Sequence, residues 1–202
     1  WFEGSRPKTI PAAIVPVIVG TASVETGFTL HRFVLALVVS IALQVGVNYA
    51  NDYSDGIRGT DQNRIGPRRL VGSGLINANQ VKLAAGISFL LAAIAGLVLA
   101  IMTSLWLILI GCIAILAAWF YTGGSRPYGY SGYGEVSVFI FFGLVATVGS
   151  SYVQSQTIET ISMLSSVPVG LLASALLEVN NFRDIETDSE TGKQTFAVRL
   201  GK

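Results

Sequence analysis

The chain has 202 residues, of which 51% are hydrophobic and only 12% are charged, and its formal net charge is +1. Soluble domains carry about 25% charged residues, so this composition excludes an ordinary soluble protein and predicts an integral membrane protein. The balanced charge, with no strongly basic or acidic tail, also argues against a nucleic-acid partner.

Six apolar segments predict helices that cross the lipid bilayer, because a spanning helix needs roughly 20 apolar residues. They cover residues 10–24, 33–50, 81–102, 104–121, 136–152 and 161–179. The first segment is short and contains Pro11 and Pro16, so we expect it to be kinked or to extend back toward Trp1. The expected fold class is all-α, a multi-pass transmembrane helical bundle in which residues 1–202 form a single domain.

The positions of the basic residues predict how the bundle is oriented. If the N-terminus is cytoplasmic and six helices alternate in direction, 12 of the 13 Lys and Arg residues lie on the cytoplasmic side and Arg32 alone lies outside. The twelve are Arg6, Lys8, Arg58, Arg64, Arg68, Arg69, Lys82, Arg126, Arg183, Lys193, Arg199 and Lys202. This asymmetry follows the positive-inside rule, so we expect a protein of the cell membrane with its N-terminus in the cytoplasm.

Two acidic clusters follow segments that run toward the cytoplasm. The first is Asn51-Asp52-Tyr53-Ser54-Asp55, with Asp61 beyond it, and the second runs from Asn180 to Asp188. Carboxylates at this density repel one another unless a cation lies among them, and sites with few protein ligands suit Mg²⁺ bound through substrate phosphates. The sequence therefore predicts a magnesium site at the cytoplasmic face, for a diphosphate attached to a lipid-soluble group.

Helical spacing selects the candidate residues of this site. Asn48, Asn51 (or Asp52) and Asp55 are three or four residues apart and share one helix face, and the second cluster repeats the pattern. The predicted metal ligands and catalytic carboxylates are Asp52, Asp55, Asp184 and Asp188, and the predicted substrate contacts beside them are Asn48, Asn51 and Asn181. The neighbouring acids Asp61, Glu186 and Glu190 are equally well explained as solvated loop residues.

Other polar residues are candidates for the same site. Glu178 lies inside the sixth apolar segment, where an ionisable residue is either functional or a hydrogen-bonded acid of helix packing. Arg64 and Lys193 follow the two clusters and are expected either to bind the diphosphate or to set topology and bind lipid headgroups. The loop 121–130 is rich in Gly, Pro and Tyr, which predicts a lid or wall of the site that contributes Tyr121 and Arg126.

Four runs of sequence resemble the UbiA-type intramembrane prenyltransferases. They are residues 48–56 (Asn-Tyr-Ala-Asn-Asp-Tyr-Ser-Asp-Gly), 70–74 (Leu-Val-Gly-Ser-Gly), 121–130 (Tyr-Thr-Gly-Gly-Ser-Arg-Pro-Tyr-Gly-Tyr) and 180–188 (Asn-Asn-Phe-Arg-Asp-Ile-Glu-Thr-Asp). The third and fourth runs most resemble the branch that prenylates 1,4-dihydroxy-2-naphthoate in menaquinone biosynthesis. The resemblance covers nearly the whole chain.

This resemblance implies a Mg²⁺-dependent enzyme that joins a polyprenyl group from a polyprenyl diphosphate to an aromatic ring carbon, with loss of CO₂ and formation of demethylmenaquinone. It implies that Asp52, Asp55, Asp184 and Asp188 hold the metal ions that neutralise the leaving diphosphate. Members commonly carry Tyr-x-x-x-Lys in the loop, where this chain has Tyr121 but Ser125. Members also normally have nine helices, so we expect this chain to lack its C-terminal third.

Three alternatives stay open on the sequence. Another UbiA-type aromatic prenyltransferase, such as a 4-hydroxybenzoate polyprenyltransferase, has the same acidic motifs. A CDP-alcohol phosphotransferase shares the Asp-x-x-Asp-Gly of residues 52–56, but the Ala-Arg and the paired aspartates expected after it are missing. A membrane transporter would place its polar groups near the bilayer midplane, whereas here they cluster at one face.

Overall fold

The computed structural model describes residues 1–25, 27–60 and 68–201, and every regular element in these ranges is helical. The elements are η1 (Pro7–Thr9), α1 (Ile10–Ala22), α2 (Leu30–Arg58), α3 (Ala78–Met102), α4 (Trp106–Phe120), η2 (Tyr128–Ser131), α5 (Gly134–Val138), η3 (Phe139–Val148), α6 (Gly149–Ser155), α7 (Thr160–Arg183), α8 (Ile185–Glu190) and α9 (Phe196–Leu200). The predicted all-α fold class is confirmed. Asp61 and Arg64 lie outside the described residues.

All six predicted apolar segments form helices. Four helices are long and apolar enough to cross a membrane: Leu30–Arg58, Ala78–Met102, Gly134–Ser155 and Thr160–Arg183. The first and fourth predicted segments are shorter apolar helices, Pro7–Ala22 and Trp106–Phe120. Pro11 occupies the first turn of α1, where a missing backbone N–H leaves no hydrogen bond unmade, and Pro16 lies inside the same helix.

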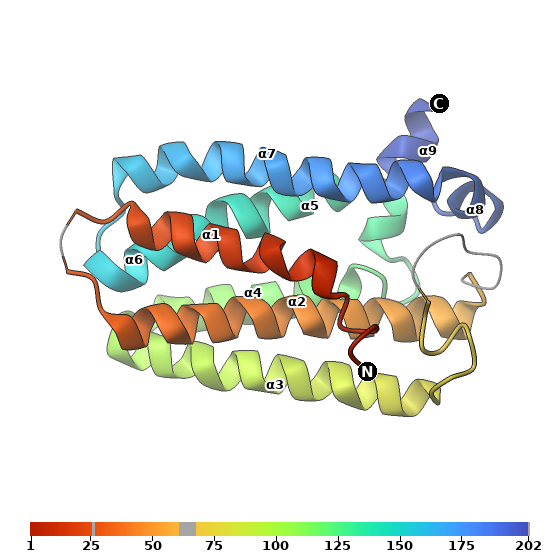
Figure 1. Cartoon of the computed structure of the whole chain (residues 1–202), viewed down its shortest axis with the longest axis horizontal. Helices are drawn as coiled ribbons and strands as arrows, with labels where there is room; N and C mark the ends of the chain where they lie inside the picture. The colour runs from red at the N-terminus through yellow and green to blue at the C-terminus, as the bar shows by residue number, and fades with distance from the viewer. Residues whose placement is uncertain (26, 61–67, 202) are drawn as a thin grey trace.

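The long helices run side by side along one axis, which leaves the connecting segments at the two ends of the bundle (Figure 1). Helix α2 packs against α3, α7 packs against η3, and α1 contacts α2, η3 and α7. The segment from α5 to α6 is continuous, and its middle, η3, is a π-helix of 10 residues. The end of α2, residues 68–77 and helices α8 and α9 lie at the right-hand end in Figure 1, so both acidic clusters reach the same end.

Small residues allow α1, η3 and α7 to pack closely. A Cβ atom added to Gly20 of α1 would lie 2.0 Å from the backbone oxygen of Thr147, and one added to Gly143 would lie 2.8 Å from the Cα of Gly170. Large apolar side chains instead point outward, as on α7, where Leu172 is 71% exposed. Close contact through small residues is how helices associate where the surrounding lipid is as apolar as the side chains.

Replacing Gly20 with Ala is therefore expected to destabilise the bundle by about 1–3 kcal/mol, the usual cost of adding a methyl group to a packed interior. The new methyl group meets backbone, which cannot rotate away. Thermal unfolding in detergent measures the effect. The matched control is Gly86→Ala on α3, where an added Cβ meets nothing within 4 Å. Equal unfolding temperatures for Gly20→Ala and the wild type would contradict the close contact.

Candidate active site

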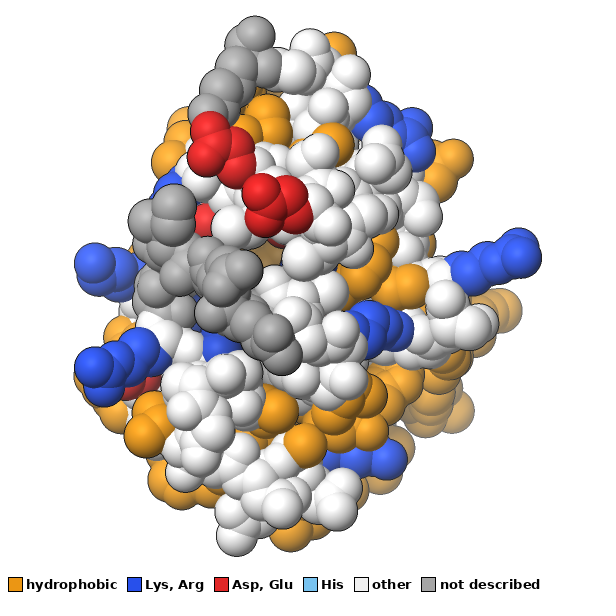
Figure 2. Space-filling view, turned by 90° about the vertical axis from the view of Figure 1, so that its right-hand side faces the viewer, with side chains coloured by type: hydrophobic (Ala, Val, Ile, Leu, Met, Phe, Trp, Pro, Cys, Tyr) orange, Lys and Arg blue, Asp and Glu red, His pale blue; other side chains and the backbone are white. Residues whose placement is uncertain are grey.

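A cavity of about 1360 Å³ runs along the inside of the bundle, and we refer to it as the central cavity. Its polar end is lined by Asp55, Arg69, Asp188 and Lys193, and its other end reaches the apolar cluster that includes Leu99. Figure 2 looks onto the polar end of the molecule, where Asp and Glu side chains gather in the upper part of the face and Lys and Arg side chains are spread over the face and along its edges. The central cavity therefore joins a charged mouth to an apolar interior.

The two acidic clusters meet at the side chain of Lys193. Its Nζ lies 3.3 Å from Oδ2 of Asp55, on the last turns of α2, and 3.7 Å from Oδ1 of Asp188, on α8. The backbone N–H of Lys193 donates to the Asp188 carbonyl oxygen, and the next residue, Gln194, donates to the Tyr130 carbonyl oxygen. These bonds hold Lys193 between the two carboxylates, so the predicted approach of the two clusters occurs at this residue.

The other two predicted metal ligands are placed differently. Asp184 lines the central cavity, but its two carboxylate oxygens accept bonds of 2.7 and 2.8 Å from the guanidinium of Arg183. Asp52 does not line the cavity, and its carboxylate accepts bonds from the backbone N–H groups of Leu70 and Val71. Among the described residues no three His, Cys, Asp or Glu side chains are arranged to hold a metal ion. The four aspartates therefore do not form one cluster in this structure.

The predicted asparagines are tied to neighbouring segments. Asn51 Oδ1 accepts a bond of 2.8 Å from the hydroxyl of Thr122, and Asn181 Nδ2 donates a bond of 2.7 Å to Glu135. Both asparagines line the central cavity. The predicted substrate contact Glu178 does not line it and lies beside Glu135 and Asn181.

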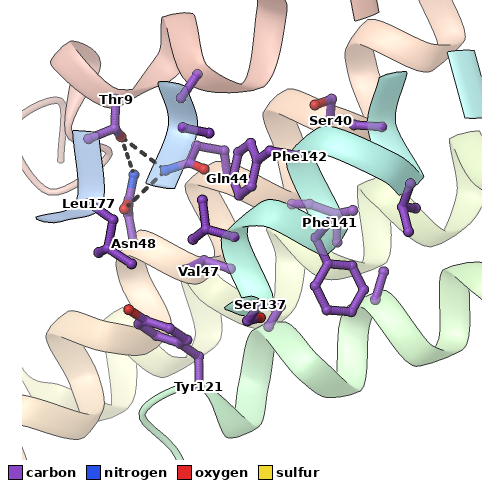
Figure 3. Close-up of a pocket in the computed structure, with 18 of the residues that line it drawn as sticks. Thr9, Ser40, Gln44, Val47, Asn48, Tyr121, Ser137, Phe141, Phe142 and Leu177 are labelled. Carbon is purple, nitrogen blue, oxygen red and sulfur yellow. Dashed lines mark hydrogen bonds between the residues drawn. The ribbon is translucent and has the colours of Figure 1, made fainter. Parts of the chain in front are cut away.

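A small polar group of Thr9, Gln44 and Asn48 lines the cavity (Figure 3). Gln44 Nε2 donates to Thr9 Oγ1 over 3.0 Å, and Asn48 Nδ2 donates to the same hydroxyl over 3.0 Å and to the Ser5 carbonyl over 2.8 Å. Figure 3 shows Tyr121 and Leu177 near Asn48, with Phe141 and Phe142 farther along the cavity. The predicted residues Asn48 and Tyr121 thus line one cavity between its charged mouth and its apolar interior.

The loop after α4 closes one side of the mouth. The guanidinium of Arg58 donates to the carbonyl oxygens of Thr122 and Gly124, and the hydroxyl of Tyr130 donates to Oδ1 of Asp55. Burial, and then the neighbouring Asp55 carboxylate, raise the pKa of the Tyr130 phenol, which keeps its proton in place as a donor. The predicted wall is therefore present, whereas Arg126 is exposed and does not line the central cavity.

Arg69, Thr122 and Tyr130 are site residues that helical spacing does not identify. Arg69 NH2 lies 3.5 Å from Asp55 Oδ2, and Lys193 Nζ lies 4.8 Å from the centre of the Tyr130 ring. All three line the central cavity. Their sequence signals are weak: Arg69 is one of several basic residues that follow the first cluster, and Thr122 and Tyr130 fall within the Tyr-Thr-Gly-Gly-x-x-Pro-Tyr-Gly-Tyr run. Neither signal says which side chains face the site.

Comparison with known proteins gives a consistent result. The sequence pattern of the UbiA prenyltransferase family matches residues 13–202. The chain is 52% identical to the 1,4-dihydroxy-2-naphthoate octaprenyltransferase of Mycobacterium tuberculosis, in an alignment that covers 100% of the chain and 70% of the relative. It is 41% identical to the enzyme of the same name from Escherichia coli, covering 100% of the chain and 68% of the relative.

Two solved structures share the fold. A UbiA homolog from Archaeoglobus fulgidus, bound to DMAPP and Mg²⁺, superposes with a TM-score of 0.76 at 14% identity, over 98% of this chain and 68% of that one. The apo structure of a UbiA homolog from Aeropyrum pernix superposes with a TM-score of 0.68 at 18% identity, over 96% of this chain and 68% of that one. At these identities the likeness concerns the arrangement of helices.

Proposed function

Because the chain belongs to the UbiA prenyltransferase family, we propose that it transfers a polyprenyl group from a polyprenyl diphosphate to 1,4-dihydroxy-2-naphthoate in menaquinone biosynthesis. The naphthoate is the acceptor in the names of relatives that are 50% and 52% identical to this chain. The observation that carries the proposal is the meeting of Asp55, Asp188 and Lys193 at one end of a long cavity. A polyprenyl diphosphate requires both a charged site for its diphosphate and a long apolar cavity for its prenyl chain.

The carboxylates at the mouth fit a magnesium ion shared with the diphosphate. Mg²⁺ is usually bound through one or two carboxylates together with substrate phosphates, rather than by a complete cage of protein ligands. Asp55 and Asp188 already hold a cationic group between them, namely the ammonium of Lys193. We assign Asp55 and Asp188 as ligands, with Asp184 as a third candidate on the same cavity wall. The bound ion would neutralise charge on the leaving diphosphate.

The transfer also needs positive charge beside the leaving diphosphate and protection of the allylic cation from water. The allylic C–O bond breaks, its electron pair leaves with the diphosphate, and the ring carbon that carries the carboxylate supplies the electron pair for the new C–C bond. Loss of CO₂ returns an electron pair to the ring. Lys193 and Arg69 place positive charge beside the departing diphosphate. The apolar walls around Phe141 and Phe142 keep water from the allylic cation.

The polar group of Thr9, Gln44 and Asn48 is the proposed contact for the hydroxyl groups of the acceptor. It is an amide and hydroxyl cluster that lines the cavity, and on α2 its members Asn48 and Gln44 lie about two and about three helical turns from Asp55. An acceptor held there has the charged mouth on one side and the apolar interior on the other. Hydrogen bonds from the polar group thus fix the orientation of the acceptor ring, which a hydrophobic wall alone does not do.

The protein is an integral membrane protein by its apolar helices and its family. We propose that it lies in the cell membrane with the charged mouth toward the cytoplasm. Basic residues at helix ends support this orientation. Arg58 at the end of α2, Lys82 near the start of α3 and Arg183 at the end of α7 lie at the end of the bundle that holds the mouth. Arg32 lies near the start of α2, at the opposite end.

The proposed function predicts the outcome of a transfer assay. Membranes that contain the protein are supplied with a radiolabelled polyprenyl diphosphate and either 1,4-dihydroxy-2-naphthoate or 4-hydroxybenzoate, with Mg²⁺ or with EDTA. We expect prenylated product and CO₂ release with the naphthoate and Mg²⁺ only. Product from 4-hydroxybenzoate instead would assign the other aromatic acceptor, and no product from either acceptor would overturn the proposal.

A further inference from the structure

Asp52 is as deeply buried as Asp55 but, unlike Asp55, does not line the central cavity. Its side chain is among the largest that are fully buried, with 1% of the residue exposed. Oδ2 accepts a bond of 2.8 Å from the backbone N–H of Leu70, and Oδ1 accepts one of 3.0 Å from the N–H of Val71. Both carboxylate oxygens are therefore committed to the backbone of one turn, and bonds from N–H groups to an ionised carboxylate are among the stronger hydrogen bonds in proteins.

The turn that Asp52 holds is well ordered by its own bonds. Ser73 donates both its N–H and its hydroxyl to the Arg69 carbonyl oxygen, and the N–H of Ile76 donates to the Leu70 carbonyl oxygen over 3.0 Å. Leu70 is 3% exposed and packs in the core cluster that contains Tyr49 of α2. The turn is thus fixed to α2 by one buried apolar side chain and by the Asp52 carboxylate.

Arg69 projects from this turn into the mouth of the central cavity. It immediately precedes the two residues whose N–H groups bind Asp52, and its guanidinium lies 3.5 Å from the Asp55 carboxylate. Arg69 is 8% exposed and lines the cavity together with Lys193. The two bonds that Asp52 accepts therefore hold the backbone directly after Arg69.

We propose that Asp52 is a positioning residue: it holds the turn of residues 69–73 against α2 so that Arg69 reaches the diphosphate end of the central cavity. This inference rests on the proposed function and separates the two aspartates of the first motif. Asp55 faces the cavity, whereas Asp52, one turn back on the same helix, acts through Arg69. On this proposal Asp52 affects the binding of the diphosphate, through Arg69, and does not bind Mg²⁺.

The test is a double-mutant cycle between Asp52→Asn and Arg69→Gln. The amide retains the size of the side chain but accepts only one of the two N–H bonds. We expect Asp52→Asn to raise the KM for the prenyl diphosphate about tenfold with a smaller change in kcat, and to leave the Mg²⁺ concentration for half-maximal activity unchanged. In the Arg69→Gln background the same change is expected to raise KM by less than about threefold. Ser54→Ala, at a buried polar position on the same helix, is the matched control with unchanged KM.

Equal KM effects of Asp52→Asn in both backgrounds would overturn the inference, as would a tenfold rise in the Mg²⁺ requirement. Should Asp52→Asn fail to fold, Ser73→Ala loosens the same turn from its other side, and an unchanged diphosphate KM there would also overturn it. Calorimetric binding of inorganic diphosphate with Mg²⁺ is measured on the same proteins. If the wild type transfers no prenyl group, the proposed function fails, while the binding cycle still decides the role of Asp52.

Discussion

Asp55→Asn is expected to lower the rate of prenyl transfer by about 10²- to 10³-fold, the usual effect of removing one preorganised electrostatic partner at a reacting charge. The Asp55 carboxylate contacts Lys193, Arg69 and the hydroxyl of Tyr130. An amide has the same shape but no charge, so it neither binds a metal ion strongly nor balances the two neighbouring cations. The change therefore removes a proposed metal ligand and disturbs the arrangement of Lys193, Arg69 and Tyr130 around it.

The rate is measured at saturating prenyl diphosphate and naphthoate, with Mg²⁺ titrated so that weakened metal binding is separated from a slower reaction. The matched control is Glu190→Gln, which makes the same chemical change at an exposed acid on α8 near the same end of the bundle. We expect the control to retain activity within about twofold. An Asp55→Asn enzyme with more than a tenth of wild-type activity would rule out Asp55 as a metal ligand.

The fold was predictable because hydropathy alone defines helices in a bilayer. Each of the six apolar segments forms a helix, and the breaks between helices fall close to the predicted ones. The prediction failed to identify the π-helix of residues 139–148, since its residues are a uniformly apolar run with no signal that distinguishes one helical hydrogen-bond pattern from another. It also placed the end of the first segment two residues too late and gave the fourth segment more length than its helix, Trp106–Phe120, has in the structure.

The site was predictable only as far as local spacing reaches. Helical periodicity correctly grouped Asn48, Asn51 and Asp55, which all line the central cavity. It left Asn51 and Asp52 as alternatives for one position, because adjacent residues on a helix differ by only 100° and the choice depends on what packs on each side. The deciding contacts come from Leu70 and Val71, 18 and 19 residues farther along the chain. Such contacts belong to tertiary structure and leave no periodic pattern.

Lys193→Met is the second change with a large expected effect, and it acts on stability as well as on activity. Lys193 is 8% exposed and contributes the ammonium between the Asp55 and Asp188 carboxylates. Removing one partner of a buried ion pair costs about 3–5 kcal/mol, because the remaining charge stays buried without compensation. Here two carboxylates would lose the ammonium that lies between them.

Mg²⁺ distinguishes this effect from general damage to the bundle. In EDTA the Lys193→Met protein is expected to unfold at a clearly lower temperature than the wild type, and in excess Mg²⁺ most of the difference should disappear, because a cation bound between Asp55 and Asp188 relieves their repulsion. Prenyl transfer should remain about 10²-fold reduced even with Mg²⁺, since the ammonium beside the diphosphate is still missing.

Lys82→Met, at an exposed lysine of α3, serves as the control for loss of a positive charge at the same end of the bundle. A stability deficit of Lys193→Met that is equal in EDTA and in Mg²⁺ would show that the two carboxylates do not share a metal ion, and would leave Lys193 as a purely structural link between α2 and α8.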